Sequence, residues 1–237
     1  MKSYQVHLIR HGLTDANFNG QYIGATDVDL SAEGVARLTK LKSEATYPTV
    51  DKIFCSPLLR CRHTAEILYP VHTDFIIEND FAECNFGDWE GKTADELKNN
   101  KDFLLWLKNS EKSCPNGGES LKSFNLRVTS AFERLVEAVV KGDIKDTAIV
   151  THGGVIMTIL ATFGVPRAKF FDWVVNNGCG YSVRIMPSLW MRQKVVEVYA
   201  KVPYNLAREN NEESAYIVDL VRGASESDGI HENSGET

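Results

Sequence analysis

The stretch Val6-His7-Leu8-Ile9-Arg10-His11-Gly12 and the stretch Ala148-Ile149-Val150-Thr151-His152-Gly153-Gly154 share one pattern. In each, an apolar run typical of a buried strand leads to a histidine that glycine follows. In open α/β sheets, the carboxyl ends of neighbouring parallel strands border the crevice in which ligands bind. The sequence therefore predicts that His11 and His152 lie together at one edge of a mostly parallel sheet.

Strand and helix patterns alternate along the rest of the chain. Short β-rich runs predict strands over Gln5–Ile9, Lys52–Cys55, Phe75–Glu78 and Thr147–Thr151. Helical spacing and capping residues predict helices from Ser31 to about Glu44 and over Leu58–Leu68, Ser120–Lys141 and Gly154–Phe163. Near the end, Gly180–Met186 and Trp190–Val202 flank Pro187-Ser188 and indicate a hairpin. This alternation predicts an α/β fold in which a mostly parallel central sheet carries helices on both faces.

The pattern predicts one domain over residues 1–203. Polar and aromatic pieces at about 92–120 interrupt the alternation, and we expect them to form a small lid inserted over the sheet edge. Residues 204–237 form an acidic C-terminal tail, which we expect to be partly disordered because its end is rich in Ser, Gly, Glu and Asp. Within this tail, Ala215–Val221 is an apolar island that could dock on the body of the protein or on a partner.

Charge and composition exclude several classes of protein. From Asn205 onward there are eight acidic and two basic residues, and the other 204 residues hold 24 of each, so the net charge of −6 belongs to the tail. Because no segment has a basic excess, we expect no nucleic-acid partner and no membrane partner. No apolar run approaches the ~20 residues that cross a bilayer. The start lacks a signal-peptide pattern, and five scattered cysteines without a Cys-x-x-Cys pair indicate reduced thiols, so we expect a cytoplasmic protein.

Three further side chains suit a bound phosphate. Arg10 offers an always-charged donor fork that matches phosphate oxygens. Arg60 is expected in the first turn of a helix, where a cation is unfavourable unless an anion faces it. Glu83 lies in sequence among Phe81, Phe86 and Trp89, a setting that would favour its protonated form and suit it to protonate a departing alcohol.

Structural roles explain some of these residues equally well at this point. A histidine after a strand can simply be held by hydrogen bonds at a turn, and Arg10 can be an incidental polar residue there. We expect Arg62, Asp88 and Glu90 to face solvent. The six histidines and five cysteines form no closely spaced ligand set, so no metal site is predicted.

Taken together, four motifs resemble the signatures of the histidine phosphatase superfamily, branch 1, whose fold is phosphoglycerate mutase-like. In the family's order they are Arg10-His11-Gly12, Ser56-Pro-Leu-Leu-Arg60-Cys-x-x-Thr64-Ala65, Glu83 within Glu-x-x-x-Gly-x-x-Glu-Gly, and Val150-Thr-His152-Gly. The resemblance implies that His11 attacks phosphorus to give a phosphohistidine, while Arg10, Arg60 and His152 clamp the phosphoryl oxygens. It also implies that Glu83 acts first as acid and then as base, that Asn17, Gly12 and Gly153 assist phosphate binding, and that no metal ion or cofactor takes part.

The superfamily contains both hydrolases and mutases, and the details of the motifs favour a hydrolase. Ile23 stands before Gly24, where mutases typically carry a hydroxyl residue, and Glu83-Cys-Asn-Phe-Gly replaces their Glu-Arg-His-Tyr-Gly. Glu83 and His152 are 69 positions apart, which is short for a mutase. We therefore expect a phosphomonoester hydrolase. The alternatives are a phosphoglycerate mutase and an inactive phosphate-binding or scaffold protein of the same fold.

The motifs are most similar to those of small bacterial phosphatases such as α-ribazole phosphatases. This similarity implies a small phosphorylated metabolite as the partner, either a phosphorylated sugar or a nucleoside-like molecule. Phe103 and Trp106 could stack on an aromatic leaving group, although packing of a lid helix explains them as well. The sequence leaves the physiological substrate and the oligomeric state, a homodimer included, open.

Overall fold

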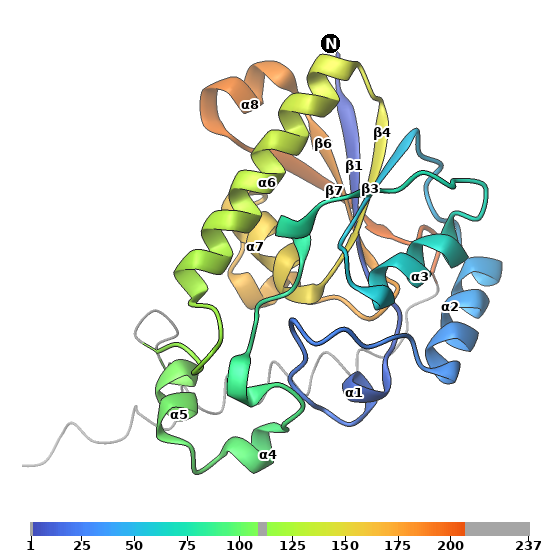
Figure 1. The fold of residues 1–237 in the computed structure, drawn as a ribbon. Coiled ribbons are helices and arrows are strands. Elements are labelled where there is room, and N and C mark those ends of the chain that lie inside the picture. The colour runs from blue at the N-terminus through green and yellow to red at the C-terminus, as the bar shows by residue number, and fades with distance from the viewer. Residues whose placement is uncertain (1, 109–112, 207–237) are drawn as a thin grey trace, which may run out of the picture.

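The computed structural model describes residues 2–108 and 113–206, which contain a seven-stranded sheet in the order β3-β2-β4-β1-β6-β7-β5 (Figure 1). The strands are β1 (Tyr4–Arg10), β2 (Lys52–Cys55), β3 (Ile76–Ile77), β4 (Asp146–Thr151), β5 (Gly164–Val165), β6 (Gly180–Ile185) and β7 (Val196–Val202). Within these described residues, six strands run in one direction and β6 runs against its neighbours β1 and β7. The prediction of a mostly parallel sheet is confirmed.

The register of the central strands decides where the two histidine turns lie. In the parallel pair of β1 and β4, Arg10 lies opposite Thr151. The backbone N–H of His11 then donates to the carbonyl of Thr151 at 2.9 Å, so the chain leaves both strands at the same level. His11 and His152 therefore emerge side by side at the carboxyl edge of the sheet, as the paired sequence patterns predict.

Helices cover both faces of this sheet (Figure 1). One apolar core joins the sheet to α2 and α3, and the other joins it to α6, α7 and α8. The α-helices are α1 (Asp15–Phe18), α2 (Ala32–Glu44), α3 (Leu59–Leu68), α4 (Ala94–Leu97), α5 (Lys101–Lys108), α6 (Leu121–Gly142), α7 (Gly153–Phe163) and α8 (Pro187–Gln193). Short 3-10 helices lie at Asn79–Phe81, Gly87–Trp89 and Phe170–Trp173. The predicted caps are present, because the hydroxyl oxygens of Ser31 and Ser120 accept the N–H groups of Gly34 and Ser123.

The predicted hairpin near the end of the chain is wrong in its connection. Its strands do pair antiparallel as β6 and β7, but α8 joins them where the sequence indicated a tight turn at Pro187-Ser188. Proline suits the first turn of a helix, where its missing N–H costs nothing. The indole of Trp190 then packs into the core against Phe132 and Phe163, so burial of this side chain fixes the helix.

The insertion predicted at about 92–120 contains α4 and α5 in its described part. These helices pack a small aromatic core against the preceding segment, with Trp89, Leu97 and Phe103 buried and Tyr22 and Trp106 against them. None of the described helices is both long and apolar enough to span a membrane. The predicted disorder of the tail and the docking of Ala215–Val221 lie outside the described residues.

Candidate functional site

His11 is held in the tautomer that a nucleophile needs. Its Nδ1 lies 2.7 Å from the carbonyl oxygen of Gly12, which can only accept, so Nδ1 carries the proton and Nε2 keeps its lone pair. Burial, followed by the nearby charges of Arg60 and Arg10, lowers the pKa of His11 well below its usual value. The ring is therefore neutral at physiological pH, and its free nitrogen can attack an electrophile.

His152 lies beside His11 at the N-terminus of α7. The two ring centroids are 5.2 Å apart and the ring planes are inclined by 62°. Its Nε2 lies 2.7 Å from the hydroxyl oxygen of Ser56, in the turn after β2, and this contact fixes the ring orientation. Burial and the charge of Arg60 lower the pKa of His152 as well. Ser56 stands in the quoted motif, but its role in positioning His152 was not predicted from the sequence.

Two arginines supply fixed positive charge around these rings. Arg60, in the first turn of α3, is 1% exposed, and its Nη1 and Nη2 donate to the carbonyls of Thr26 and Gly24 at 2.9 and 2.7 Å. Among the described residues, no carboxylate lies within ion-pair distance of Arg60. Arg10 ends β1, donates to the carbonyl of Val175 at 2.8 Å, and lies against Gly153. For Arg60, a buried cation whose guanidinium donates to these carbonyls, a phosphate would supply a matching anion.

Glu83 reaches the same place from the segment before the insertion. Its Oε1 and Oε2 each accept a backbone N–H at 2.9 Å, from Cys84 and from Gly154 in the first turn of α7. Burial raises the pKa of Glu83, while these two N–H groups and the arginines oppose the rise. A carboxyl whose proton is retained above the ordinary carboxyl range, beside two neutral imidazoles, suits general acid catalysis.

The remaining predicted binding residues support this arrangement. The N–H of Gly12 donates to the hydroxyl of Thr64 at 2.9 Å, so α3 fixes the turn that carries His11. The side-chain oxygen of Asn17 caps α1, and Asn177 donates to that oxygen and to the carbonyl of His11. Asn177 was not found from the sequence, because a lone asparagine 166 residues away carries no local signal. A Cβ at Gly153 would only touch Arg10, so this glycine is not required by sterics.

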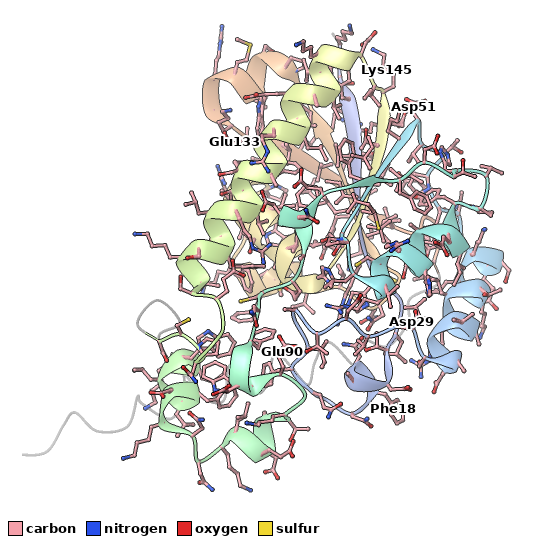
Figure 2. The ribbon with its side chains drawn as sticks, in the orientation of Figure 1. Phe18, Asp29, Asp51, Glu90, Glu133 and Lys145 are labelled. Carbon is pink, nitrogen blue, oxygen red and sulfur yellow. The ribbon has the colours of Figure 1, made fainter. Side chains whose placement is uncertain are left out.

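The prediction that Glu90 faces solvent is wrong. Glu90 lies against the loop after α1, where its two carboxylate oxygens accept the backbone N–H groups of Gly24, Ala25, Thr26 and Phe86 (Figure 2). Arg62 and Asp88 are exposed, as predicted. Glu90 was misjudged because backbone donors that gather around a carboxylate leave no pattern in the side-chain sequence.

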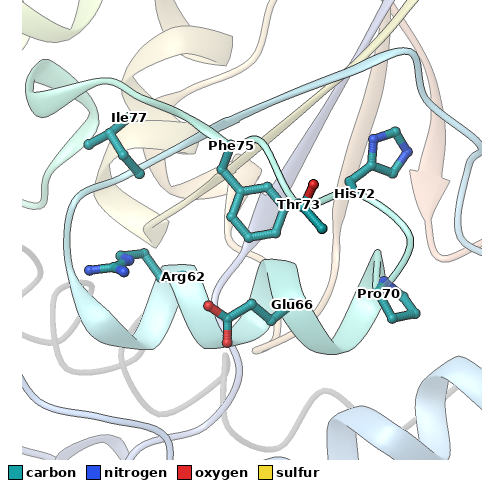
Figure 3. A pocket seen from close by; sticks show the side chains of 7 residues that line it. All are labelled: Arg62, Glu66, Pro70, His72, Thr73, Phe75 and Ile77. Carbon is teal, nitrogen blue, oxygen red and sulfur yellow. The ribbon is translucent and has the colours of Figure 1, made fainter.

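Two features lie apart from the predicted phosphate-binding side chains. Phe103 is 1% exposed and stacks on Trp106, so these rings build the small aromatic core, and Phe103 is not available to a substrate. A groove of about 490 Å³ lies between α3 and the 70–77 segment (Figure 3). Arg62, Glu66 and Phe75 are among its lining residues, and it includes none of the predicted site residues.

Comparison with known proteins agrees with this geometry. Residues 6–197 match the family model of the histidine phosphatase superfamily (branch 1). The chain is 30% identical over 186 residues to an adenosylcobalamin/alpha-ribazole phosphatase of Salmonella typhimurium, covering 75% of this chain and 89% of that protein. It is 33% identical over 181 residues to phosphoserine phosphatase 1 of Hydrogenobacter thermophilus, covering 74% and 83%.

Solved structures give the same result. The crystal structure of the alpha-ribazole phosphatase from Shigella flexneri superposes with a TM-score of 0.72 at 27% identity, over 87% of this chain and all of that one. A phosphoglycerate mutase from Thermus thermophilus superposes with a TM-score of 0.61 at 28% identity, over 86% and 99%. The fold is thus phosphoglycerate mutase-like, and the similar curated proteins named above are phosphatases. The chain belongs to the histidine phosphatase superfamily, branch 1, and is a phosphoric monoester hydrolase.

Proposed function

We propose that this hydrolase works through a phosphohistidine on His11. The Nε2 lone pair attacks the phosphorus of a phosphomonoester, the P–N bond forms, and the bond from phosphorus to the ester oxygen breaks. Glu83 gives its carboxyl proton to the departing oxygen, so the product leaves as a neutral alcohol. Arg10, Arg60 and His152 stabilise the charge on the three non-bridging oxygens during the transfer.

A water molecule then completes the cycle. The Glu83 carboxylate takes a proton from this water, whose oxygen attacks the phosphorus of the phosphohistidine. The P–N bond breaks, inorganic phosphate leaves, and both His11 and Glu83 return to their starting protonation states. Gly12, Gly153 and Asn17 keep the phosphate-binding turns in place. No step in this cycle needs a metal ion or a redox cofactor.

The observation that carries the proposal is the protonation pattern of the site. The Gly12 carbonyl fixes the proton of His11 on Nδ1, and burial together with two arginines keeps that ring neutral. Burial also favours the protonated carboxyl of Glu83. The nucleophile is thus in the state that the first step requires, and burial shifts the acid toward its required state, near the buried guanidinium of Arg60.

We infer that the substrate is a small phosphomonoester, either a phosphorylated sugar or a nucleoside-like metabolite. The names of the relatives, which include alpha-ribazole and phosphoserine phosphatases, support a small organic phosphate as the substrate.

We also infer that the catalytic domain spans residues 1–203, with the 92–120 segment as its lid and 204–237 as an acidic tail.

The test is hydrolysis of p-nitrophenyl phosphate and a panel of metabolite phosphomonoesters by wild type, His11→Asn and His72→Asn. We expect wild type and His72→Asn to turn over alike, and His11→Asn to lose at least about a thousandfold in kcat. Turnover that survives in His11→Asn would contradict nucleophilic catalysis by this residue. Preference for phosphoproteins over every small ester would contradict the substrate class.

A further inference from the structure

Glu90 binds an unusual number of backbone donors for a side chain outside the phosphate site. Its Oε1 lies 3.0 Å from the nitrogens of Gly24 and Ala25 and 2.9 Å from that of Phe86. Its Oε2 lies 3.0 Å from the nitrogen of Gly24 and 3.2 Å from that of Thr26. These N–H groups more than offset the effect of partial burial, so the pKa of Glu90 lies below its usual value. The carboxylate therefore acts as an anionic anchor for the chain around Gly24.

The loop that Glu90 anchors is the one that holds Arg60. We call residues 24–27 the arginine loop. The carbonyls of Gly24 and Thr26, within this loop, accept Nη2 and Nη1 of Arg60 at 2.7 and 2.9 Å. The loop also caps α3, because Asp27 accepts the N–H of Leu59 at 2.7 Å. The guanidinium and the first turn of its helix are thus both fixed by four consecutive residues.

Close packing keeps the arginine loop in register with the segment that carries Glu90. A Cβ at Gly24 would lie 1.6 Å from the carbonyl oxygen of Cys84, so only glycine fits there. Tyr22 exchanges backbone hydrogen bonds with the 91–92 turn, donating to the carbonyl of Lys92 at 2.9 Å and accepting from Gly91 at 2.8 Å. Gly24, Ala25 and Thr26 form a bend that turns their N–H groups toward Glu90, while the carbonyls of Gly24 and Thr26 face Arg60.

We propose that Glu90 is a positioning residue for phosphoryl transfer: it holds the arginine loop so that the carbonyls of Gly24 and Thr26 aim the Arg60 guanidinium at the phosphate. The bonds to Gly24 and Thr26 use two of the five N–H donors of Arg60, and the phosphoryl oxygens would take others. Glu90 does not touch the substrate. This inference rests on the phosphate-binding role proposed above for Arg60.

One substitution tests whether the acceptor oxygens of Glu90, and not merely the size of its side chain, are needed. Glu90→Gln keeps the size but places an NH₂ group where one acceptor oxygen stood, so two donors face each other and a backbone N–H loses its partner. We expect kcat/KM to fall about tenfold to a hundredfold. A displaced Arg60 guanidinium should lower kcat/KM by part of the factor that its removal would. The fall should be equal for p-nitrophenyl phosphate and for an alkyl phosphate, since Arg60 does not act on the leaving group. The inhibition constant of inorganic phosphate should rise with it.

The matched control is Glu96→Gln. Glu96 also accepts a backbone N–H, that of Thr93 at 2.8 Å, in the capping box of α4, but it has no link to Arg60. We expect this variant to keep kcat/KM within about twofold of wild type. Glu90→Asp retains the charge but cannot reach all four donors, and we expect it to fall between wild type and Glu90→Gln. It also replaces Glu90→Gln if that variant does not fold.

The decisive experiment is a double-mutant cycle with Arg60→Ala, measured as kcat/KM on both esters. We expect Glu90→Gln to change kcat/KM by less than about twofold once Arg60 is gone. If Glu90→Gln matches wild type, or lowers kcat/KM by the same factor with and without Arg60, the inference about Glu90 is overturned while the proposed function stands. If Arg60→Ala itself matches wild type, the proposed phosphate clamp fails, and the role of Glu90 fails with it.

Discussion

The imidazole of His11 lies edge-on to that of His152, with 5.2 Å between the ring centroids, although 141 positions separate the two residues in the sequence. Parallel pairing of β1 with β4 creates this contact, because it places Arg10 opposite Thr151 and lets both chains leave the sheet together. His11 and Arg60 are among the groups that lower the pKa of His152. A pair of neutral imidazoles between arginines is suited to receive a doubly negative phosphate.

The pH dependence of turnover should reveal Glu83. Because burial raises its pKa, the carboxyl stays protonated above its ordinary range and loses its proton as the pH rises further. For an alkyl phosphate, kcat should therefore fall on the alkaline side, and Glu83→Gln should lower kcat about a hundredfold and remove that alkaline limb. The substrate's own titration near pH 6 should appear in kcat/KM of both enzymes. An unchanged alkaline limb in Glu83→Gln would exclude Glu83 as the acid.

Arg127 should control the same proton transfer from a distance. Its guanidinium donates to the carbonyls of Asp80, Ala82 and Glu83 at 2.8 to 3.0 Å and forms a two-pronged pair with Glu119 at 2.8 Å. We expect Arg127→Lys to cost about 1 to 3 kcal/mol of stability, because this fork cannot be rebuilt by an ammonium.

The kinetic signature of Arg127→Lys is dependence on the leaving group. Hydrolysis of an alkyl phosphate should slow about tenfold or more, while p-nitrophenyl phosphate, whose leaving group needs little protonation, should slow less than about threefold. Arg134→Lys is the control, since Arg134 pairs with the side chain of Asp80 at 2.7 Å but does not hold the chain at Glu83. Equal losses on both esters would show that Arg127 acts only through general stability.

The two glycines after His152 should differ in their tolerance of alanine. A Cβ at Gly154 would lie 2.4 Å from Oε1 of Glu83, whereas a Cβ at Gly153 would make an ordinary contact at 3.5 Å with Nε of Arg10. Gly154→Ala should therefore displace the Glu83 carboxyl and slow alkyl phosphate hydrolysis about tenfold. Its thermal stability should not rise, because the helix preference of alanine is opposed by the loss of the hydrogen bonds that Glu83 accepts. Gly153→Ala should retain most of the turnover. If both variants have the same activity, the contact with Glu83 is not the reason that position 154 requires glycine.

His7 should make the folded state sensitive to acid. Burial lowers the pKa of this ring to about 4, and its Nδ1 lies 2.8 Å from the hydroxyl of Ser182. Between pH 6.5 and about 4 the unfolded chain binds a proton here that the folded chain does not, so stability is complete above that range and falls as the pH drops. Because of His7, the free energy of unfolding should fall by about 2 kcal/mol as the pH drops from 6.5 to 5. Denaturant unfolding of His7→Asn should show a pH dependence weaker by that amount, and an unchanged dependence would contradict the assignment.

Local patterns predicted the central strands, the long helices and the meeting of His11 and His152 at the sheet edge. An apolar run followed by His-Gly is readable at both ends of the parallel pair, and the caps at Ser31 and Ser120 are where the sequence places them. Trp190 shows the limit of such patterns, because only the core formed by Phe132 and Phe163 makes its helix favourable. A tertiary contact overrode a local turn signal there.

The residues that position the site could not be predicted from the sequence for a related reason. Glu90, Arg127 and Asn177 act on backbone groups of distant segments, and every residue offers the same backbone groups. No spacing or residue type marks which carboxylate will meet four N–H groups. Such roles become visible only when the loops are placed in space.

The central claim is that His11 is transiently phosphorylated, and rapid acid-free quenching during turnover of a ³²P-labelled phosphomonoester tests it most directly. The trapped enzyme should carry one label that survives base and is lost in acid, as a phosphorus–nitrogen bond is, and peptide mapping should place it on His11. His11→Asn should carry none. A label on another side chain, or rapid turnover with no labelled enzyme at any time, would contradict the mechanism.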